Sequence, residues 1–169
     1  MSDLLNSTAF RIVLGIDPGA HGAVAVFVDG KLDAIFDTPA LEEKSGRPAV
    51  NAPLLASLMA KTQATTAYCE FVGARPTDAK ASAFAFGRSR GVLEGICGAL
   101  ALPISFITPQ TWKRLTSIAP GTEAKDTARA VAIAKWPHMA EMFARKKDID
   151  RAEACLIGWA ALQREGRNV

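Results

Sequence analysis

Four carboxylates at widely separated positions are the residues of this chain whose types and spacing could do chemistry. Asp17 ends an apolar run, RIVLGID (11–17), and Glu70 lies near the end of another, TTAYCEF (65–71). Asp150 and Glu153 stand three residues apart, which places both on one face of a helix. Clustered carboxylates repel one another unless a cation lies among them, and their oxygen atoms favour Mg²⁺ or Mn²⁺. Two such ions about 3.5 to 4 Å apart can hydrolyse a phosphodiester bond, so the pattern predicts a metal-dependent hydrolase.

Each of these acids also has a structural interpretation. Asp17 precedes a Pro-Gly dipeptide and can simply begin a turn, whereas Asp150 and Glu153 before the apolar run ACLIGWAAL are typical of a capping box. Glu70 is harder to explain in this way, because a charge in an apolar strand is costly unless it is paired or bound to a metal. Asp148 is an additional candidate metal ligand, although the two lysines before it suggest an ion pair or the entry to a helix.

A mixed sheet is needed to bring these carboxylates together. The Asp29-Gly30 dipeptide is typical of a two-residue hairpin. Apolar runs with β-branched residues predict five strands, at 11–17, 22–28, 31–37, 65–71 and 103–107. If the first and fourth strands are parallel neighbours, Asp17 and Glu70 emerge at the same edge of the sheet.

Helices and loops fill the intervals between these strands. Residues 38–52, rich in turn formers, are predicted to form a mobile loop. Helices are predicted at 53–61, 78–100, 123–136 and 150–164, with a short one starting at Pro109. The resulting order fits an α/β fold of ribonuclease H-like architecture: a mixed five-stranded sheet, three strands antiparallel and the others parallel, flanked by helices.

Length and composition exclude several classes of protein. The chain has 169 residues, 49% hydrophobic and 22% charged, which is ordinary for a globular protein. We expect one domain at 11–165, with an N-terminal extension at 1–10 and a tail at 166–169. Three separated cysteines, the lack of a signal-peptide pattern and the lack of a long uncharged apolar stretch predict a cytoplasmic protein outside the membrane. With only two histidines, the sequence has few residues for a zinc site built on several histidines or for a Ser-His-Asp triad.

The predicted helix at 78–100 carries small residues at every fourth position. Ala83, Gly87, Gly91 and Gly95 lie on one face, and glycine inside a helix costs about 1 kcal/mol relative to alanine, which suggests a packing reason. Such a stripe allows another backbone to approach closely. The partner could be another part of the same chain or a second copy in a dimer.

Four separated blocks of this sequence together resemble the RuvC-type Holliday-junction resolvases. These blocks are GIDPG (15–19), EFV (70–72), FGRSRGVLEGI (86–96), and Trp112-Lys113 with KDIDRAEACLIG (147–158). The resemblance covers about residues 11–163. It implies that Asp17, Glu70, Asp150 and Glu153 are the catalytic metal ligands of a homodimeric enzyme. Such an enzyme uses Mg²⁺ or Mn²⁺, with two ions in each active site, to nick two strands of a four-way DNA junction symmetrically.

The resemblance also implies partners and a place of action. It favours the dimer interpretation of the small-residue stripe, and it suggests DNA in the nucleoid or at viral replication sites, with branch-migration machinery as a further partner. The chain departs from the family pattern in having Glu153 where Asp is common, and Gly73 where an aromatic residue wedges the junction open. Phe71 is then the nearest aromatic, either at the junction or packed in the core. The loop at 39–52 could reach DNA through Lys44 and Arg47.

Charge is distributed unevenly along the chain, although the total is only +3. Residues 1–64 carry five basic and seven acidic side chains, whereas residues 109–151 carry nine basic and five acidic ones, for a local charge of +4. We expect the basic segment to face DNA, with binding that weakens steeply as salt rises. The family resemblance implies that Lys113 and Lys125 contact the DNA backbone, although both could simply be solvated surface lysines. The full set of residues predicted to contact DNA is Arg75, Lys80, Lys113, Arg114, Lys125, Lys146 and Lys147. Two alternatives to a junction resolvase are a ribonuclease H-like nuclease with broader branched-DNA or other nucleic-acid substrates, and a junction-binding protein without catalysis.

Overall fold

The computed structural model describes residues 10–44, 46–71, 73, 77–119 and 124–166, with only the backbone described for 124 and 125. Its main sheet has five strands in the order β3-β2-β1-β6-β7. β1, β2 and β3 are antiparallel, whereas β6 and β7 run parallel to β1. The predicted mixed sheet is therefore confirmed. The strands are β1 (Ile12–Asp17), β2 (Ala23–Val28), β3 (Lys31–Asp37), β6 (Thr66–Glu70) and β7 (Ile104–Ile107).

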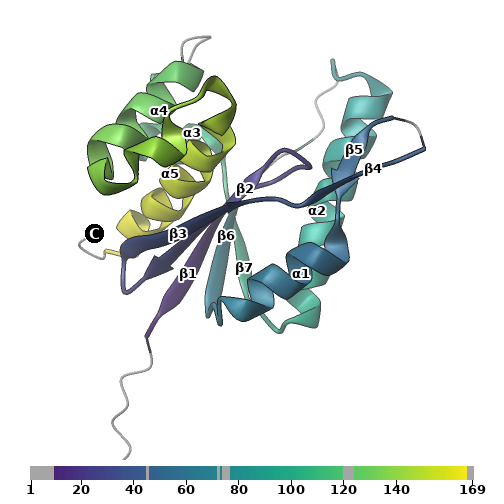
Figure 1. Cartoon of the computed structure of the whole chain (residues 1–169), viewed down its shortest axis with the longest axis horizontal. Coiled ribbons are helices and arrows are strands. Elements are labelled where there is room, and N and C mark those ends of the chain that lie inside the picture. The colour runs from purple at the N-terminus through teal and green to yellow at the C-terminus, as the bar shows by residue number, and fades with distance from the viewer. Residues whose placement is uncertain (1–9, 45, 72, 74–76, 120–123, 167–169) are drawn as a thin grey trace, which may run out of the picture.

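Helices cover both faces of this sheet. Figure 1 shows α1 and α2 on one face and α3, α4 and α5 on the other, so the fold has three layers. None of the helices that the structure describes is long and apolar enough to cross a membrane. The α-helices are α1 (Ala52–Lys61), α2 (Lys80–Ala99), α3 (Pro109–Leu115), α4 (Ala124–Lys135) and α5 (Ile149–Arg164), with 3-10 helices η1 (Pro137–Phe143) and η2 (Lys146–Asp148) before α5.

The prediction of a loop over residues 38–52 is wrong for two short segments. β4 (Ala40–Glu42) and β5 (Pro48–Val50) pair antiparallel as a hairpin beside α2 (Figure 1). Ala49 and Val50 are buried, and Val50 belongs to the apolar cluster between the sheet and α1 and α2. The local turn formers hide this hairpin, because its stability comes from packing against residues far away in the sequence. Lys44 and Arg47 lie at its exposed end.

Helix α5 packs directly on β1, and two glycines allow its close approach. A Cβ added to Gly15 would lie 2.4 Å from the carbonyl oxygen of Ala154 and 2.6 Å from Cα of Gly158. A Cβ on Gly158 would lie 2.5 Å from the Phe27 ring. These contacts bring the backbones of α5 and β1 together, so the first turns of α5 lie at the end of β1.

The small-residue stripe on α2 faces open space. A Cβ added to Gly87, Gly91 or Gly95 would meet none of the described atoms of the chain within 4 Å. Ala83 is on the same helix face and is half-buried. Among the described residues, none packs against these three glycines, which contradicts the intramolecular explanation for that part of the stripe; the dimer explanation stays a prediction.

Candidate metal centre

The ends of β1 and β6 carry the first two predicted ligands. Ile16 pairs with Cys69 in the parallel ladder, so Asp17 and Glu70 are the next residues of the same two strands. Side chains alternate along a strand, and Gly15 faces α5, so Asp17 faces α5 too. The side chain of Asp17 is buried, with 7% of the residue exposed.

Helix α5 supplies the other two carboxylates. Asp17, Asp150 and Glu153 each offer an oxygen atom, and these atoms all lie within 4.8 Å of one another. Asp150 is in the first turn of α5, and the helix begins before it, at Ile149. Asp150 is therefore inside the helix and does not cap its start, so the capping-box interpretation is wrong. The structure brings three of the four predicted ligands together.

Three full negative charges on Asp17, Asp150 and Glu153 would be electrostatically unfavourable. Burial raises the pKa of Asp17 well above its usual value, and the negative charges of Glu153, Glu70 and Asp150 raise it further. A hydrogen bond with the Asp150 carboxyl group adds to the rise. A buried carboxylate surrounded by like charges is stable only with a proton or a cation beside it.

Glu70 lies outside the three-residue group and has a partner of its own. Nε1 of Trp112 donates a hydrogen bond of 2.8 Å to Oε1 of Glu70. Burial raises the pKa of Glu70, while this hydrogen bond and the positive charge of Lys113 oppose the rise. Trp112 is fully buried, so its indole is held in place by the core. Glu70 is thus close enough to Asp17 to raise its pKa, yet it is oriented by α3.

Asp148, the additional candidate ligand, is paired with arginines. Its carboxylate accepts hydrogen bonds of 2.8 Å from the backbone nitrogen and from Nη2 of Arg145, and Nη1 of Arg151 lies 3.6 Å away. The hydrogen bonds from Arg145 lower the pKa of Asp148, whereas burial acts in the opposite direction and raises it; the net effect is a lowered pKa. Only 2% of the Asp148 side chain is exposed. Asp148 therefore forms ion pairs at the entry to α5, as predicted, but its side chain is buried and not solvated.

The donor set of this site fits a hard divalent cation. Asp17, Asp150 and Glu153 offer only carboxylate oxygen atoms, which are the ligands that Mg²⁺ and Mn²⁺ prefer. The raised pKa of Asp17 is the expected sign of a site whose charge a cation would compensate. Glu70 is the fourth residue that could join them from the neighbouring strand.

Two of the residues predicted to contact DNA, Lys113 and Lys147, lie near carboxylates of the candidate metal centre. Lys113 is half-buried, with Nζ 5.2 Å from the Trp112 ring centroid. Lys147 shares with Asp150 the lining of a cavity of about 640 Å³ between the β1–β2 turn and α5. Lys80, Arg114 and Lys146 are exposed on α2, α3 and η2. Arg75 and the Lys125 side chain lie outside the described residues.

Phe71 stands directly after Glu70 and is 42% exposed. Its ring meets that of Phe106 edge to face, and the guanidinium of Arg90 lies 4.9 Å from its centroid. The core-packing interpretation of Phe71 is therefore wrong. A half-exposed aromatic next to a site residue is available to a ligand.

Sequence reasoning missed three residues that shape this site. In the sequence Trp112 stands out only as part of a motif, because its hydrogen bond to Glu70 joins residues 42 positions apart. Gly158 sets the approach of α5 to β1, but it looks like any small residue in an apolar helix. Arg151 lies between Asp150 and Glu153 in the sequence of α5, and it pairs with Asp37, which is 114 positions away. No local pattern predicts contacts at such separations.

Among the comparisons with known proteins, the one with solved structures bears on the fold. A scan against protein-family models and a search of curated proteins each found no match. Among solved structures, the chain is similar to Thermus thermophilus RuvC in complex with a Holliday junction substrate, with a TM-score of 0.55 and 12% identity. A second RuvC structure from the same organism matches with a TM-score of 0.53 and 15% identity. Each match covers 92% of this chain and 97% of the other. The chain has a RuvC-type, ribonuclease H-like fold.

Proposed function

We propose that a chain with this RuvC-type fold is a metal-dependent DNA endonuclease that resolves four-way junctions by paired symmetric nicks, as a crossover junction endodeoxyribonuclease. The observation that carries the proposal is the group of Asp17, Asp150 and Glu153, whose oxygen atoms lie within 4.8 Å of one another at the sheet edge. Support for the junction as substrate comes from the similar fold of a RuvC bound to a Holliday junction.

The chain's own residues would bind the metal and orient the substrate. Mg²⁺ or Mn²⁺, two ions in each site, would supply a water nucleophile at neutral pH and stabilise the leaving oxygen. Asp17, Asp150 and Glu153 would hold the metal, with Glu70 as a fourth ligand turned by Trp112. Burial of Asp17 excludes water from one side of the site. Metal binding would favour the ionised form of Asp17, against the burial and the like charges that raise its pKa.

Basic residues around the site would hold the DNA backbone. Lys113 on α3 and Lys147 before α5 flank the carboxylates. Lys80, Arg114 and Lys146 would extend the contact as exposed cations. We also assign Arg75 and Lys125 to this contact, by their places in the sequence. Neutralising several phosphates releases counterions, so affinity would fall steeply with salt.

Two symmetric nicks require two sites, so we propose a homodimer joined through α2. The stripe of Ala83, Gly87, Gly91 and Gly95 supports this, because no described residue of the single chain packs against its glycines. Phe84, on the same helix face three residues before Gly87, is 72% exposed. A small-residue surface beside an exposed aromatic ring suits close packing of two identical helices. Such a dimer would work with DNA wherever junctions form, with branch-migration machinery as a further partner.

Cleavage of a panel of labelled DNA substrates tests this function. The purified chain is incubated with Mg²⁺ or Mn²⁺ and a four-way junction, beside linear duplex, a flap and an RNA/DNA hybrid. We expect paired nicks in the junction and little cleavage of linear duplex. Asp17→Asn and Glu70→Gln each remove a proposed metal ligand and should each abolish cleavage while sparing junction binding.

Other outcomes of the same panel identify the alternatives. Equal rates on junction and linear duplex, or faster cleavage of the hybrid, would indicate a ribonuclease H-like nuclease with broader substrates. Tight junction binding without cleavage by the unmodified chain would indicate a junction-binding protein. Full activity in Asp17→Asn would contradict the metal mechanism.

A further inference from the structure

The first turn of α5 is under electrostatic repulsion from the strand that it must meet. Asp150 and Glu153 project from α5 to within 4.8 Å of Asp17 on β1, and all three are carboxylates. Whenever Asp17 is ionised, like charges at this distance push the helix away from the sheet until a cation binds. The arrangement in the cation-free protein therefore needs an opposing contact near the start of α5.

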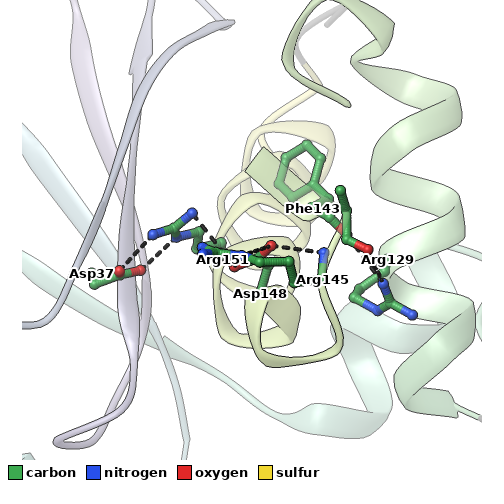
Figure 2. A network of polar contacts seen from close by, with 7 residues as sticks. Asp37, Arg129, Phe143, Arg145, Asp148 and Arg151 are labelled. Atoms are coloured by element: carbon green, nitrogen blue, oxygen red, sulfur yellow. Dashed lines mark hydrogen bonds and ion pairs between the residues drawn. The ribbon is translucent and has the colours of Figure 1, made fainter. Parts of the chain in front are cut away.

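Arg151, which lies between Asp150 and Glu153 in the sequence of α5, makes such a contact. Its Nε and Nη2 donate hydrogen bonds of 2.6 Å each to Oδ1 and Oδ2 of Asp37, the last residue of β3. Its Nη1 lies 3.6 Å from Oδ1 of the buried Asp148. Figure 2 shows Arg151 between the two carboxylates, with Arg145 on the far side of Asp148. Planar two-point pairing of this kind fixes direction as well as distance.

The register of the sheet places this contact in line with the carboxylate group. Asp17 pairs with Ala23 of β2, and Ala23 pairs with Asp37 of β3. Directly opposed residues point to the same face, so Asp17 and Asp37 both face α5, two strands apart. Neighbouring strands are about 4.8 Å apart, so the attraction acts roughly 10 Å from the repulsion, on the same turn of helix.

We propose that Arg151 is a positioning residue: its pairing with Asp37 and Asp148 holds the start of α5 against the sheet, so that Asp150 and Glu153 stay within reach of Asp17 before the metal binds. This inference rests on the proposed metal site. Arg151 itself does not contact DNA, because its side chain is only 17% exposed and two carboxylates occupy it. Its effect is on the affinity of the site for the cation.

A second arginine–carboxylate pair offers a matched control at the other end of the same helix. Arg11 pairs with Glu165, just after α5, through hydrogen bonds of 2.8 and 3.0 Å. Arg11→Gln removes a two-point pair of the same chemistry but leaves the start of α5 untouched. Both pairs join α5 to the sheet, so both losses should lower the unfolding midpoint. Only the loss of the Arg151 pair should change metal affinity.

Titration of the full chain with Mn²⁺, followed by calorimetry and by the electron paramagnetic resonance of free Mn²⁺, tests the proposal without any cleavage assay. We expect Arg151→Gln and Asp37→Asn each to weaken Mn²⁺ binding about tenfold, and the double variant to be no weaker than either single one. Arg151→Lys should recover part of the affinity. Arg11→Gln should bind Mn²⁺ within twofold of the unmodified chain.

The results that would overturn the role of Arg151 differ from those that would overturn the proposed function. Asp37 is 59% exposed, so Asp37→Asn remains a test if Arg151→Gln does not fold. Unchanged Mn²⁺ affinity in folded Arg151→Gln or Asp37→Asn, or equal weakening in Arg11→Gln, would overturn the positioning role alone. An unmodified chain that binds no Mn²⁺ would overturn both this role and the proposed function. Normal Mn²⁺ binding without cleavage of any substrate would overturn only the proposed function.

Discussion

Nε1 of Trp112 donates a hydrogen bond of 2.8 Å to Oε1 of Glu70, which joins the buried indole of α3 to the carboxylate at the end of β6. The bond satisfies the only polar atom of a fully buried side chain and orients a carboxylate that burial alone would protonate more easily. One contact therefore serves both the core and the candidate metal centre.

Trp112→Phe should shift the pH dependence of the site. The hydrogen bond lowers the pKa of Glu70, so its loss raises that pKa, and Glu70 then stays protonated to higher pH. Because a metal ligand must be deprotonated, the acid limb of Mg²⁺-dependent cleavage should move to higher pH. Mg²⁺ affinity should fall about tenfold or more, as for other groups that orient a ligand. A pH–rate profile with a Mg²⁺ titration measures both.

Trp159→Phe is the matched control for this variant. The Trp159 indole nitrogen is buried and has no hydrogen-bond partner among the described residues. Its removal deletes the same N–H group without affecting Glu70. A pH profile that moves equally in both variants would contradict the role of the Trp112 bond.

Asp17→Asn should stabilise the metal-free protein while abolishing cleavage. The pKa of Asp17 is raised in the folded state, so folding favours its protonated form. The stability that this proton contributes is lost as pH rises from the ordinary carboxyl value through the raised one. At neutral pH the variant should unfold roughly 2–4 °C higher, equivalent to about 1 kcal/mol.

Thermal unfolding at several pH values, with and without Mg²⁺, measures this effect. The unmodified chain should lose stability as pH rises through that window and regain it with excess Mg²⁺, whereas both responses should be smaller in Asp17→Asn, in which Glu70 remains as a carboxylate whose pKa is raised by burial. Asp33→Asn, at an exposed position on β3, removes the same charge and should behave as the unmodified chain. A lower unfolding temperature for Asp17→Asn at neutral pH would contradict the electrostatic argument.

Gly15→Ala should displace α5. The new Cβ would lie 2.4 Å from the carbonyl oxygen of Ala154 and 2.6 Å from Cα of Gly158, and backbone atoms cannot turn aside. We expect a loss of about 3 kcal/mol in the free energy of unfolding, together with weaker Mn²⁺ binding because Asp150 and Glu153 move. Gly98→Ala meets nothing within 4 Å among the described residues and should gain up to about 1 kcal/mol. Equal stability of the two variants in urea denaturation would refute the close-approach argument.

Gly91→Leu should weaken the proposed dimer and leave the single chain folded. Within the described part of the chain, the added side chain starts in open space, so the helix has no internal reason to unfold. A bulky residue would keep two α2 helices apart, and the dimer dissociation constant should rise at least tenfold. Sedimentation velocity measures it, with Ala60→Leu at an exposed position of α1 as control. A dimer of unchanged affinity would place the interface elsewhere.

Phe71→Ala should lower the preference for junctions over linear duplex. The ring is 42% exposed beside Glu70, and stacking of a base on an aromatic ring is worth about 1–3 kcal/mol. Junction cleavage should therefore fall about tenfold, with Mn²⁺ affinity unchanged. Phe10→Ala removes another exposed ring and should have no effect. Equal cleavage of junctions by both variants would assign Phe71 a purely structural role.

The sequence by itself determined the elements and the candidate ligands they carry. An apolar run ending in Asp17, the Asp29-Gly30 turn and the spacing of Asp150 and Glu153 are local patterns, because side-chain period and turn conformation depend on neighbours in the chain. They predicted the mixed sheet and the edge at which the carboxylates meet. They also placed Asp17 and Glu70 at or near the ends of two strands, and the structure makes those two strands parallel neighbours.

Only the tertiary structure decided how these ligands are held and which of them group together. Asp17 meets Asp150 and Glu153 because α5 approaches β1 across Gly15 and Gly158, while Glu70 turns to an indole on α3. The buried pairing of Asp148 and the contact between Arg151 and Asp37 likewise join separate segments of the fold. Such contacts depend on the packing of several elements at once, which no local pattern encodes. The hairpin of β4 and β5 was missed for the same reason, since it is stabilised by burial against distant residues.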